Sequence, residues 1–506
     1  MPRAPGIRST IALKGALPAT SEYIRYIREG IPKTSSVKNI AIIGTGMSGL
    51  VAACLLVDSG HKVTLFDAAD RVGGRILTVR EPFSNDLYGE AGAMRLPSFY
   101  SLTTELIRSL ELSTDIFINH DKKGNEFIFV NGVKQRRSEY QNTKGSGLKY
   151  PILSNETGLT ADDLLTKALK PIADYVGSDP LEGFEHNRWA AVVRKFGEYT
   201  VREYLKSQTF YSEGAIEMIE VIEDLESRSD QALLQQIVEI NDHSAEVQYT
   251  EICGGMDHLP RALYQHLLDV NAPVYFNSRL TKIGREKSAV KLFFRPDSGG
   301  ELTADTFTAD EVIVTIPFPG FRYVEVNPPL SHNKRKAIRE LHYDASTKIL
   351  LQFKSRFWEK HDGIYGGCST TDLPIRFVYY PSHGFDEARG GVLIASYTWG
   401  DEARGWDSLA REHQIEAAVD QIAQLHGEYI KREFVTGFVQ SWALDRFSYG
   451  EAAMFYGGQL EELQPFIPSP EGRIHFAGEH TSLKHAWIEG AVESGIRTAL
   501  EASGQV

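Results

Sequence analysis

Cysteine is scarce in this sequence: the chain has only Cys54, Cys253 and Cys368, and they lie far apart. An odd number of widely spaced cysteines excludes a disulfide framework and the closely spaced pairs that bind structural metals. We therefore expect no metal site, and the low cysteine content fits a reducing compartment.

Long apolar runs are also missing, because no stretch approaches the length that a helix needs to cross a bilayer. The first residues, MPRAPGIRSTIALKGALPAT, carry early arginines, but Lys14 interrupts their only apolar patch. We interpret residues 1–37 as a short arm followed by a linker rather than as a signal peptide. These absences predict a soluble, cytoplasmic protein without a membrane partner.

The chain has no excess of basic residues. Its formal net charge is -13, and an acidic surface repels phosphate backbones and anionic lipids, so nucleic acid is not an expected partner. The 42% hydrophobic and 24% charged residues that it does contain are typical of a globular protein. A length of 506 residues predicts two to four domains with enough core to enclose a sizeable ligand.

Residues 38–67, KNIAIIGTGMSGLVAACLLVDSGHKVTLFD, predict a strand, a glycine turn, a helix and a second strand. Gly44 permits the tight turn, Gly46 lets a pyrophosphate approach the backbone, and Gly49 lets the helix pack closely on the strand. Asp67 ends the second strand, where a carboxylate accepts hydrogen bonds from a ribose. This context favours a dinucleotide over a glycine turn without a ligand, but it does not separate NAD from FAD.

Two further segments supply cations and a carboxylate. The string DAADRVGGRILT places Arg71 and Arg75 on either side of a glycine pair. The pair, Gly73 and Gly74, lets the chain pass close to a flat ring or a phosphate, and the arginines can neutralise pyrophosphate charge. Taken alone, this string also fits a surface turn. In RIHFAGEHT, Glu479 follows a strand, where it can accept hydrogen bonds from a polyol such as a ribityl chain.

The rest of the chain alternates between helical and strand patterns. Between about residues 157 and 240 the apolar spacing is helical and glycine is sparse, which predicts an inserted helical subdomain. Strands return between about 341 and 442, in TKILLQF, RFVYYP and GGVLIASYTWG. EVIVTIP (311–317) and GRIHFAGE (472–479) look like buried parallel strands. We predict a mixed α/β fold whose nucleotide-binding sheet is assembled from at least three distant segments.

The string GEAGAMRLP (89–97) sets a single cation, Arg95, in an otherwise small and apolar stretch. The residues alone leave two interpretations open. Arg95 could form an ordinary structural ion pair, for instance with Glu90, or it could be the cation that receives an anionic ligand.

Together, the glycine turn, RVGGR, GEAGAMRLP and FAGEHT resemble the FAD-dependent amine oxidase superfamily and, within it, the L-amino-acid oxidases. The resemblance runs from about Lys38 to Ala502, with the motifs in the same order. It implies a Rossmann-like FAD-binding domain, interleaved with a β-rich substrate-binding domain and an inserted helical domain. The expected boundaries are 38–80, 246–340 and 443–506 for the FAD-binding domain, 81–145 and 341–442 for the substrate-binding domain, and 146–245 for the helical domain.

The resemblance also implies which residues contact the cofactor, with Val274 meeting the adenine through its backbone and Trp442 lying beside the flavin. The full expected set is Gly44, Gly46, Met47, Ser48, Gly49, Asp67, Ala68, Arg71, Gly73, Gly74, Arg75, Gly92, Ala93, Met94, Val274, Trp442, Gly478, Glu479 and Trp487. Covalent attachment, as in the monoamine oxidases, needs a cysteine in the C-terminal part. No cysteine follows Cys368, so we expect FAD to be held non-covalently.

For the substrate, the resemblance implies an amino acid anchored by its carboxylate. Arg95 would pair with the carboxylate and Tyr397 would donate its hydroxyl to it. Lys348 would hold a water molecule near the flavin N5, to assist reoxidation by oxygen or hydrolysis of the imino acid. From the residues alone, Tyr397 also fits a core aromatic with a satisfied hydroxyl, and Lys348 a solvated strand end.

Four further positions match the surroundings of the reacting carbon. Trp487 would wall the amino group, Ala486 would contribute its carbonyl, and Ala452 and Trp399 would line the side-chain pocket. A small residue opposite an aromatic wall predicts room for large apolar or aromatic side chains. We find no acidic or basic residue dedicated to a charged side chain, with Glu451 left open.

The expected activity is oxidative deamination of L-amino acids to 2-oxo acids, ammonia and hydrogen peroxide, with hydride passing from the α-carbon to the flavin. No general base is evident, and an apolar pocket disfavours the ammonium form of the substrate, so a base is not required. The partners are an L-amino acid and oxygen, and the resemblance suggests a homodimer or higher homo-oligomer.

Three alternatives stay open. A flavin amino-acid 2-monooxygenase, which forms the amide, would use the same carboxylate-binding residues. A simple amine oxidase would have no use for that clamp, and a flavin-binding protein without turnover would not need Lys348.

Overall fold

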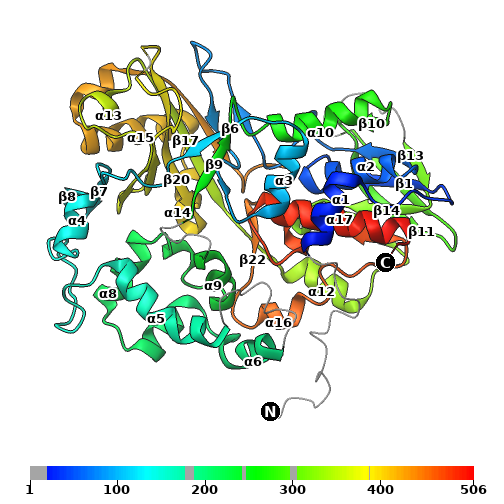
Figure 1. The fold of residues 1–506 in the computed structure, drawn as a ribbon, viewed down its shortest axis with the longest axis horizontal. Helices are drawn as coiled ribbons and strands as arrows, with labels where there is room; N and C mark the ends of the chain where they lie inside the picture. Colours follow the sequence, from blue (N-terminus) through cyan, green and yellow to red (C-terminus); the bar gives the residue numbers. More distant parts are fainter. Residues whose placement is uncertain (1–19, 177–186, 242–246, 297–304, 387, 506) are drawn as a thin grey trace.

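The computed structural model describes residues 20–176, 187–241, 247–296, 305–386 and 388–505. Three regions stand out in Figure 1: a parallel sheet with its covering helices, a large mostly antiparallel sheet, and a lobe of helices. The mixed α/β fold predicted from the sequence is confirmed, whereas the exact domain boundaries stay a prediction.

The parallel sheet has the strand order β10-β2-β1-β14-β23. Its strands are β1 (Asn39–Ile43), β2 (Lys62–Phe66), β10 (Val274–Tyr275), β14 (Glu311–Val314) and β23 (Ile474–Phe476). Residues 40–43 are buried, as a parallel strand covered on both faces requires. The strands come from distant parts of the chain, as predicted.

Helices cover one face of this sheet and a second sheet covers the other. The helices are α2 (Met47–Asp58), α10 (His258–Asp269) and α17 (Ile488–Ser503), whose apolar side chains share a core with β1. The second sheet has the order β13-β12-β11-β15. It comprises β11 (Arg279–Arg285), β12 (Val290–Arg295), β13 (Thr306–Ala309) and β15 (Glu325–Asn327). Helix α11 (Phe318–Phe321) precedes β15 and helix α12 (His332–Glu340) follows it. Phe66 stacks on Phe294 across the interface, with ring centroids 4.2 Å apart.

The large sheet has seven strands in the order β21-β17-β20-β19-β18-β7-β8. They are β7 (Phe127–Val130), β8 (Val133–Arg136), β17 (Ser346–Phe353), β18 (Cys368–Thr371), β19 (Phe377–Tyr379), β20 (Gly391–Trp399) and β21 (Phe434–Ser441). The associated helices are α13 (Phe357–Lys360), α14 (Gly400–Asp407), α15 (Arg411–His426) and the 3-10 helix η4 (Glu428–Arg432). All residues of β17 are buried, so this strand holds its side chains in a fixed environment.

Several short elements lie between the parallel sheet and the seven-stranded large sheet (Figure 1). They are β3 (Thr78–Val79) with β4 (Gly89–Glu90); β5 (Leu96–Pro97), β6 (Thr114–Phe117) and β9 (Tyr249–Ile252); β16 (His342–Asp344) with β22 (Ala452–Met454); helix α3 (Ser101–Ser109); and the 3-10 helix η5 (Glu479–Thr481). Several predicted site residues lie on or directly beside these elements.

The helical lobe lies below the large sheet in Figure 1. It contains α4 (Arg137–Thr143), α5 (Ala161–Val176), α6 (Asn187–Phe196), α7 (Val201–Tyr204), the π-helix η2 (Leu205–Thr209), α8 (Glu213–Ile222), the 3-10 helix η3 (Glu226–Arg228) and α9 (Leu233–Asn241), with α16 (Gln459–Leu463) beside it. The helical pattern predicted for residues 157–240 is confirmed where the structure describes it, and residues 177–186 lie outside the described part of the chain.

The interpretation of residues 1–37 as an arm and linker is wrong in part. Residues 20–29 form helix α1 (Thr20–Glu29), which packs on α3 and α17 through the buried Tyr23 and Tyr26. Residues 1–19 lie outside the described part of the chain. Six of the ten residues of this short helix are charged or polar, and this composition gave no sign that its two tyrosines anchor it.

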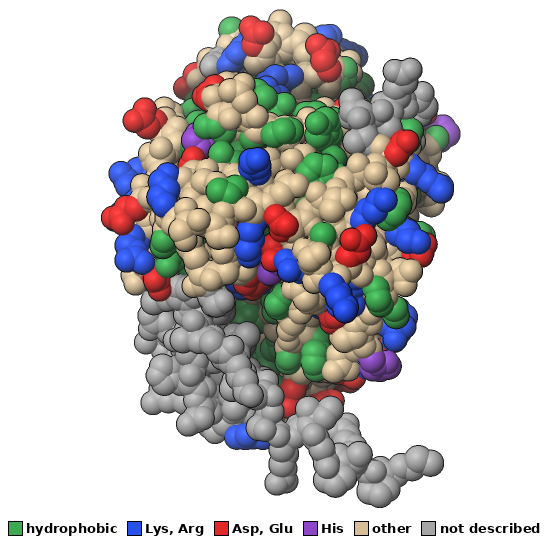
Figure 2. Space-filling model, turned by 90° about the vertical axis from the view of Figure 1, so that its right-hand side faces the viewer, with side chains coloured by type: hydrophobic (Ala, Val, Ile, Leu, Met, Phe, Trp, Pro, Cys, Tyr) green, Lys and Arg blue, Asp and Glu red, His purple; other side chains and the backbone are tan. Residues whose placement is uncertain are grey.

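Among the described residues, none of the helices is long and apolar enough to cross a membrane. On the face drawn in Figure 2, acidic and basic side chains are interspersed.

Candidate active site

The glycine turn joins β1 to α2. Gly44 has a φ of 113°, and a Cβ there would lie 2.2 Å from Thr315 Oγ1. A Cβ on Gly49 would lie 2.1 Å from the carbonyl oxygen of Gly44, so the turn itself requires both glycines. At Gly46, the N-cap of α2, a Cβ would meet nothing within 4 Å. This open backbone at a helix N-terminus fits a pyrophosphate.

Asp67 directly follows β2 and turns towards the glycine turn. Its carboxylate accepts hydrogen bonds from the amide and hydroxyl of Thr45, both at 2.6 Å, and from the amide of Ala69 at 2.8 Å. Burial raises the pKa of Asp67, and these hydrogen bonds oppose the rise. Val274 lies beside it on β10, where the carbonyl of Tyr275 accepts from the Asp67 amide at 2.9 Å. The residues predicted for the adenosine half therefore share one edge of the sheet.

Arg71 and Arg75, expected to serve the same cofactor, have different surroundings. The Arg71 guanidinium donates to the carbonyls of its own loop, at Val72, Gly74 and Ile76. Arg75 instead forms an ion pair with Glu479, 404 residues later in the chain, with 2.8 Å between Arg75 Nη1 and Glu479 Oε1. Arg71 therefore braces the loop, whereas Arg75 joins two of the predicted segments.

The carboxylate of Glu479 contacts residues from three other places in the chain. Besides Arg75, its carboxylate accepts hydrogen bonds from the amides of Ala453 at 3.3 Å and Ala486 at 3.2 Å. Ala486 has a φ of 64°, a left-handed backbone that is costly for alanine. Such strain persists where the surroundings fix it, and here it orients the peptide that leads into Trp487.

Arg95 lies in a ring of aromatic and polar side chains. It hydrogen-bonds to Asn119 Oδ1 and donates to the hydroxyl of Tyr379 at 3.1 Å, and its guanidinium lies 5.3 Å from the ring centroid of Tyr249. The alternative of an ion pair with Glu90 is wrong. In the described part of the chain Arg95 has no carboxylate within ion-pair distance, because Glu90 instead accepts hydrogen bonds from Thr78 Oγ1 and the Met256 amide.

Lys348 is almost completely buried, with 1% of its surface exposed, within β17. The alternative of a solvated strand end is therefore wrong. Its Nζ donates to the carbonyl of Gly92 at 2.6 Å and lies 4.5 Å from the ring centroid of Tyr397, its partner in strand register. Burial lowers the pKa of Lys348, so the amine titrates closer to neutrality than an exposed lysine.

The residues predicted to surround the substrate side chain do come together. Trp399, Ala452 and Met454 form one apolar cluster, against which Tyr397 and Ala486 pack. The ring centroids of Tyr397 and Trp399 lie 5.7 Å apart. Tyr397 is partly exposed rather than fully packed, unlike a core aromatic.

The remaining predicted residues support these groups from close by. Met47 and Ser48 form the first turn of α2, and Gly73 pairs with Gly46. A Cβ on Gly74 would lie 3.4 Å from Gly46 Cα, and Gly92 approaches the Arg75 carbonyl too closely for a Cβ. Ala68 follows Asp67, Ala93 and Met94 precede Arg95, Gly478 precedes Glu479, and Trp487 packs edge-on against Tyr100. Trp442 is buried and donates its indole N–H to the Ala91 carbonyl at 2.9 Å.

Sequence reasoning missed several neighbours of these residues. Tyr379 and Asn119 contact Arg95, although no motif marks them. Arg228 is buried in the helical lobe with its guanidinium 5.0 Å from the ring centroid of Trp399. Asp224, nearby on the same lobe, has its pKa raised by burial despite the guanidiniums of Arg228, Arg376 and Arg95. The helical spacing predicted the lobe, but gave no sign that Arg228, at the end of η3, lies against Trp399.

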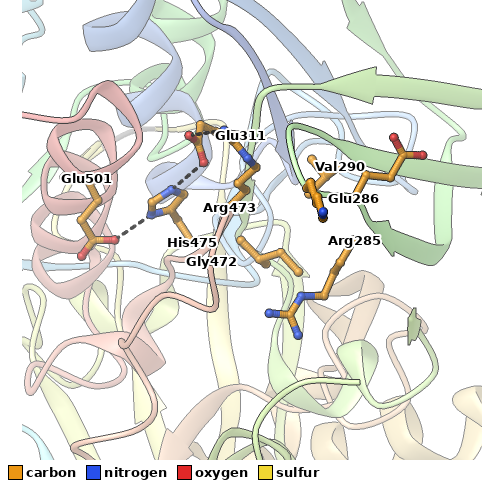
Figure 3. A pocket seen from close by; sticks show the side chains of 10 residues that line it. Arg285, Glu286, Val290, Glu311, Gly472, Arg473, His475 and Glu501 are labelled. Carbon is orange, nitrogen blue, oxygen red and sulfur yellow. Dashed lines mark hydrogen bonds and ion pairs between the residues drawn. The ribbon is translucent and has the colours of Figure 1, made fainter. Parts of the chain in front are cut away.

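A groove of about 490 Å³ at the β14 and β23 edge of the parallel sheet is a separate feature. Figure 3 shows its lining, which includes Arg285, Glu311, His475 and Glu501. None of the predicted site residues lines it. Its histidine, His475, is bonded to two of the acidic side chains that line the groove, Glu311 and Glu501.

Comparisons with known proteins agree with the geometry. Residues 47–502 match the model of a family described as flavin containing amine oxidoreductase. The glycine turn with its open Gly46, the nearby Asp67 and the Arg75–Glu479 pair fit the dinucleotide form of a flavin.

Three relatives match over nearly the whole chain. YobN of Bacillus subtilis (strain 168) is 41% identical over 482 residues, covering 95% of this chain and 98% of that protein. An L-amino-acid oxidase of Siganus canaliculatus is 37% identical, covering 96% and 89%. An L-glutamate oxidase precursor of Streptomyces viridosporus is 32% identical, covering 96% and 89%.

A solved structure of a putrescine oxidase mutant superimposes with a TM-score of 0.75 at 20% sequence identity, covering 93% of this chain and 99% of that one. At this identity the match establishes the fold.

Proposed function

Because the chain belongs to the family of flavin-containing amine oxidoreductases, with FAD as cofactor, we propose that it is an L-amino-acid oxidase. The products would be a 2-oxo acid, ammonia and hydrogen peroxide. The relative from Siganus canaliculatus is named an L-amino-acid oxidase, which supports this proposal.

The observation that carries the proposal is the environment of Arg95. This guanidinium is enclosed by Asn119, Tyr379 and Tyr249, and in the described part of the chain it has no ion-pair partner. A partly buried cation without an ion pair is costly, and a substrate carboxylate would supply the counter-charge with charge-assisted hydrogen bonds. A simple amine has no carboxylate to offer, so Arg95 favours an amino acid.

The surrounding residues suit the other parts of such a substrate. Tyr397 would donate its hydroxyl to the carboxylate, and the Ala486 carbonyl would accept a hydrogen bond from the amino group. Lys348 would hold a water molecule, while Trp487 and Trp399 would exclude bulk water from the reacting carbon. When bound, FAD supplies the acceptor for the hydride of the α-carbon and passes the electrons to oxygen.

Two substrate classes are compatible with the side-chain pocket. Trp399, Ala452 and Met454 form an apolar cluster, which favours large hydrophobic or aromatic amino acids. A second candidate is an acidic side chain, because the Arg228 guanidinium lies against Trp399 and the buried Trp399 Nε1 has no hydrogen-bond partner among the described residues. The relative named as an L-glutamate oxidase precursor makes this second class worth testing.

A peroxide-release screen over L- and D-amino acids tests the proposal directly. We expect turnover of L-amino acids with formation of the 2-oxo acid. If the products are carbon dioxide and the amide, the protein is a monooxygenase instead. If no L-amino acid bleaches the flavin spectrum under anaerobic conditions, the proposed activity is wrong.

Arg228→Leu separates the two substrate classes. If Arg228 binds an acidic substrate side chain, the kcat/KM of the variant for L-glutamate should fall by roughly 100-fold, as for loss of a buried charge pair worth about 3 kcal/mol. The kcat/KM for L-phenylalanine should be unaffected. Arg404→Leu is the matched control, because Arg404 pairs with Asp401 on the exposed side of α14. Equal effects on L-glutamate and L-phenylalanine would argue against a selective role for Arg228.

We also propose that FAD is bound non-covalently, since no cysteine lies beyond residue 368. Acid precipitation should leave a colourless pellet and a yellow supernatant. A yellow pellet would show a covalent bond.

A further inference from the structure

Glu451 is a carboxylate in the candidate active site whose role the preceding sections do not explain. Its backbone is fixed on both sides: the amide donates to the Asp344 carbonyl at 2.8 Å, and the carbonyl accepts from Arg75 at 2.6 Å. It directly precedes Ala452, at the start of β22. The backbone at Glu451 is therefore fixed by the same segments that form the site.

The carboxylate of Glu451 is not satisfied by the protein. Its Oε2 atom is buried and has no hydrogen-bond partner, and no cation lies within ion-pair distance of it, among the residues that the structure describes. The residue as a whole stays partly accessible, so a ligand can reach it.

Neighbouring acidic residues differ in this respect. Glu90 accepts from Thr78 Oγ1 and the Met256 amide, Glu479 accepts from Arg75 and two amides, and Asp344 accepts from Gln231. Native proteins leave few buried polar atoms unsatisfied, and each one that remains needs an explanation, of which a catalytic role is one. Compared with these three described acids, Glu451 has capacity left for a ligand.

Three charged side chains from different segments affect the ionisation of the Glu451 carboxylate. Lys348 of β17 has the largest electrostatic effect on its carboxylate, followed by Arg75 and by Glu479 of η5. Glu451 in turn acts on the hydroxyl of Tyr397, the predicted carboxylate ligand. Ala452, the residue that follows Glu451, belongs to the apolar cluster against which Tyr397 and Ala486 pack, so Glu451 lies at the same end of the site as the residues predicted to bind the carboxylate and the amino group.

We propose that Glu451 is the base that removes a proton from the ammonium group of the amino-acid substrate. The inference rests on the proposed oxidase function. One N–H bond of the ammonium breaks and one O–H bond forms on Glu451, which leaves a neutral amine with a free electron pair. No electrons reach Glu451, and its proton leaves later to water when the imino acid is hydrolysed.

The electrostatics suit this task. Burial raises the pKa of Glu451, and the Lys348 ammonium opposes the rise and keeps the carboxylate ionised over part of the neutral range. Burial likewise lowers the pKa of Lys348. A base is most effective when its pKa lies near the working pH, and an exposed glutamate is too weak for that.

The test compares Glu451→Gln with the matched control Glu90→Gln. The pKa of Glu90 is raised to about 8 by burial, so this acid is already largely neutral near neutral pH and its amide is a close mimic. For Glu451→Gln we expect the rate of anaerobic flavin reduction near neutral pH to fall by about 100-fold, within the usual range for a lost general base. The loss should shrink as the pH rises, because the free amine then becomes abundant in solution. Glu90→Gln should keep the wild-type pH profile.

A second readout is independent of turnover. The α-methyl derivatives of L-phenylalanine and L-glutamate have no α-hydrogen to lose and bind without reacting. At mildly alkaline pH, difference infrared spectra should show a protonated carboxylic acid when one of them binds to wild type or Glu90→Gln. The band should be missing in Glu451→Gln.

The outcomes separate the two proposals. If wild type is not reduced by any L-amino acid, the oxidase function fails and the role of Glu451 with it. If wild type is reduced but Glu451→Gln has a parallel pH profile, or the infrared band persists in that variant, only the role of Glu451 is overturned. Selective loss of lysine and arginine turnover would make Glu451 a specificity residue and would also overturn it as a base.

Discussion

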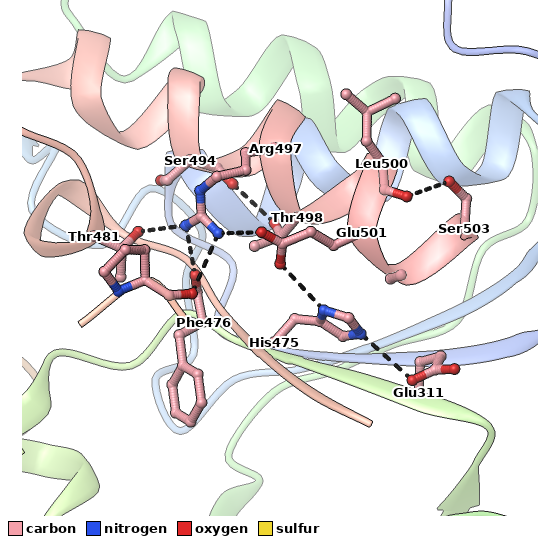
Figure 4. Close-up of polar contacts among 12 residues, drawn as sticks. Glu311, His475, Phe476, Thr481, Ser494, Arg497, Thr498, Leu500, Glu501 and Ser503 are labelled. Carbon is pink, nitrogen blue, oxygen red and sulfur yellow. Dashed lines mark hydrogen bonds and ion pairs between the residues drawn. The ribbon is translucent and has the colours of Figure 1, made fainter. Parts of the chain in front are cut away.

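Two groups of buried and partly buried charges in this protein differ in how their members are paired. At the outer edge of the parallel sheet, His475 bridges Glu311 and Glu501 at 3.4 and 3.2 Å, and Glu501 also pairs with Arg497 at 2.6 Å (Figure 4). We call these four residues the edge network. In the candidate active site, Arg95, Lys348 and Glu451, the reaction cluster, have no ion pair within 4.0 Å in the described part of the chain.

The edge network satisfies its polar atoms. Arg497 also donates to the Phe476 carbonyl at 2.8 Å and to Thr481 Oγ1 at 3.0 Å, so α17 is tied to β23 and to η5. Removing one partner of such a network strands a buried charge, which costs several kcal/mol. The reaction cluster keeps unused hydrogen-bonding capacity, which favours a ligand over stability. The first group should therefore control folding and the second should control kinetics.

The largest effect is expected for Arg95→Ala. Loss of two hydrogen bonds to a charged group, worth about 2 kcal/mol each, lowers kcat/KM by roughly 1,000-fold. The change should appear mainly as a higher KM, with flavin content and melting temperature close to wild type. Steady-state peroxide assays with absorbance measurement of bound flavin check this. Loss of flavin in proportion to activity would mean that Arg95 serves the cofactor instead.

Arg497→Met should show the opposite pattern. It leaves Glu501 without its guanidinium and should lower the free energy of unfolding by about 3 kcal/mol, with kcat unchanged in the folded fraction. Urea unfolding measures the first quantity and peroxide assays the second. The control is Lys170→Met, because Lys170 and Asp174 form an exposed pair, with 68% and 62% of their side chains accessible, that contributes under about 1 kcal/mol. Equal losses in the two variants would contradict a structural edge network.

His475→Gln tests the same network through pH. Burial alone would lower the pKa of His475, but hydrogen bonds to Glu311 and Glu501 outweigh it and raise the pKa above its usual value. A raised pKa stabilises the fold at pH below the unfolded value of about 6.5 and loses that effect as the pH rises through the folded value. The variant should thus be less stable than wild type at mildly acidic pH and nearly equal to it at alkaline pH. A loss independent of pH would indicate packing alone.

The sequence was informative where local patterns decide the structure. The apolar runs and the G-x-G-x-x-G spacing predicted β1, the turn and α2, because each depends on residues close together in the chain. The motif residues Arg75 and Glu479 were also predicted, although their ion pair joins positions 404 residues apart and no local pattern shows it.

The environments of the site residues could not be predicted from the sequence. Lys348 follows a polar stretch, and only pairing of β17 with strands on both sides buries it. Tyr379 and Asn119 lie in unremarkable segments, and their contact with Arg95 depends on how β19 and the residues after β6 pack. Glu451 could be noted as a nearby charge, but its unsatisfied oxygen is a property of the folded chain.

The smallest expected effect is a gain of stability in Glu451→Gln. Burial raises the pKa of Glu451 above that in the unfolded chain, so its ionised form destabilises the fold at pH above the folded value. The amide removes this cost, although Lys348 loses a counter-charge, and we expect a gain of at most about 1 kcal/mol. Thermal unfolding at several pH values should show a difference that opens as the pH rises through neutrality and closes at acidic pH, where wild type is protonated in both states. A lower melting temperature at every pH would assign Glu451 to the same structural class as the edge network, because a carboxylate kept for chemistry should not be one on which folding depends.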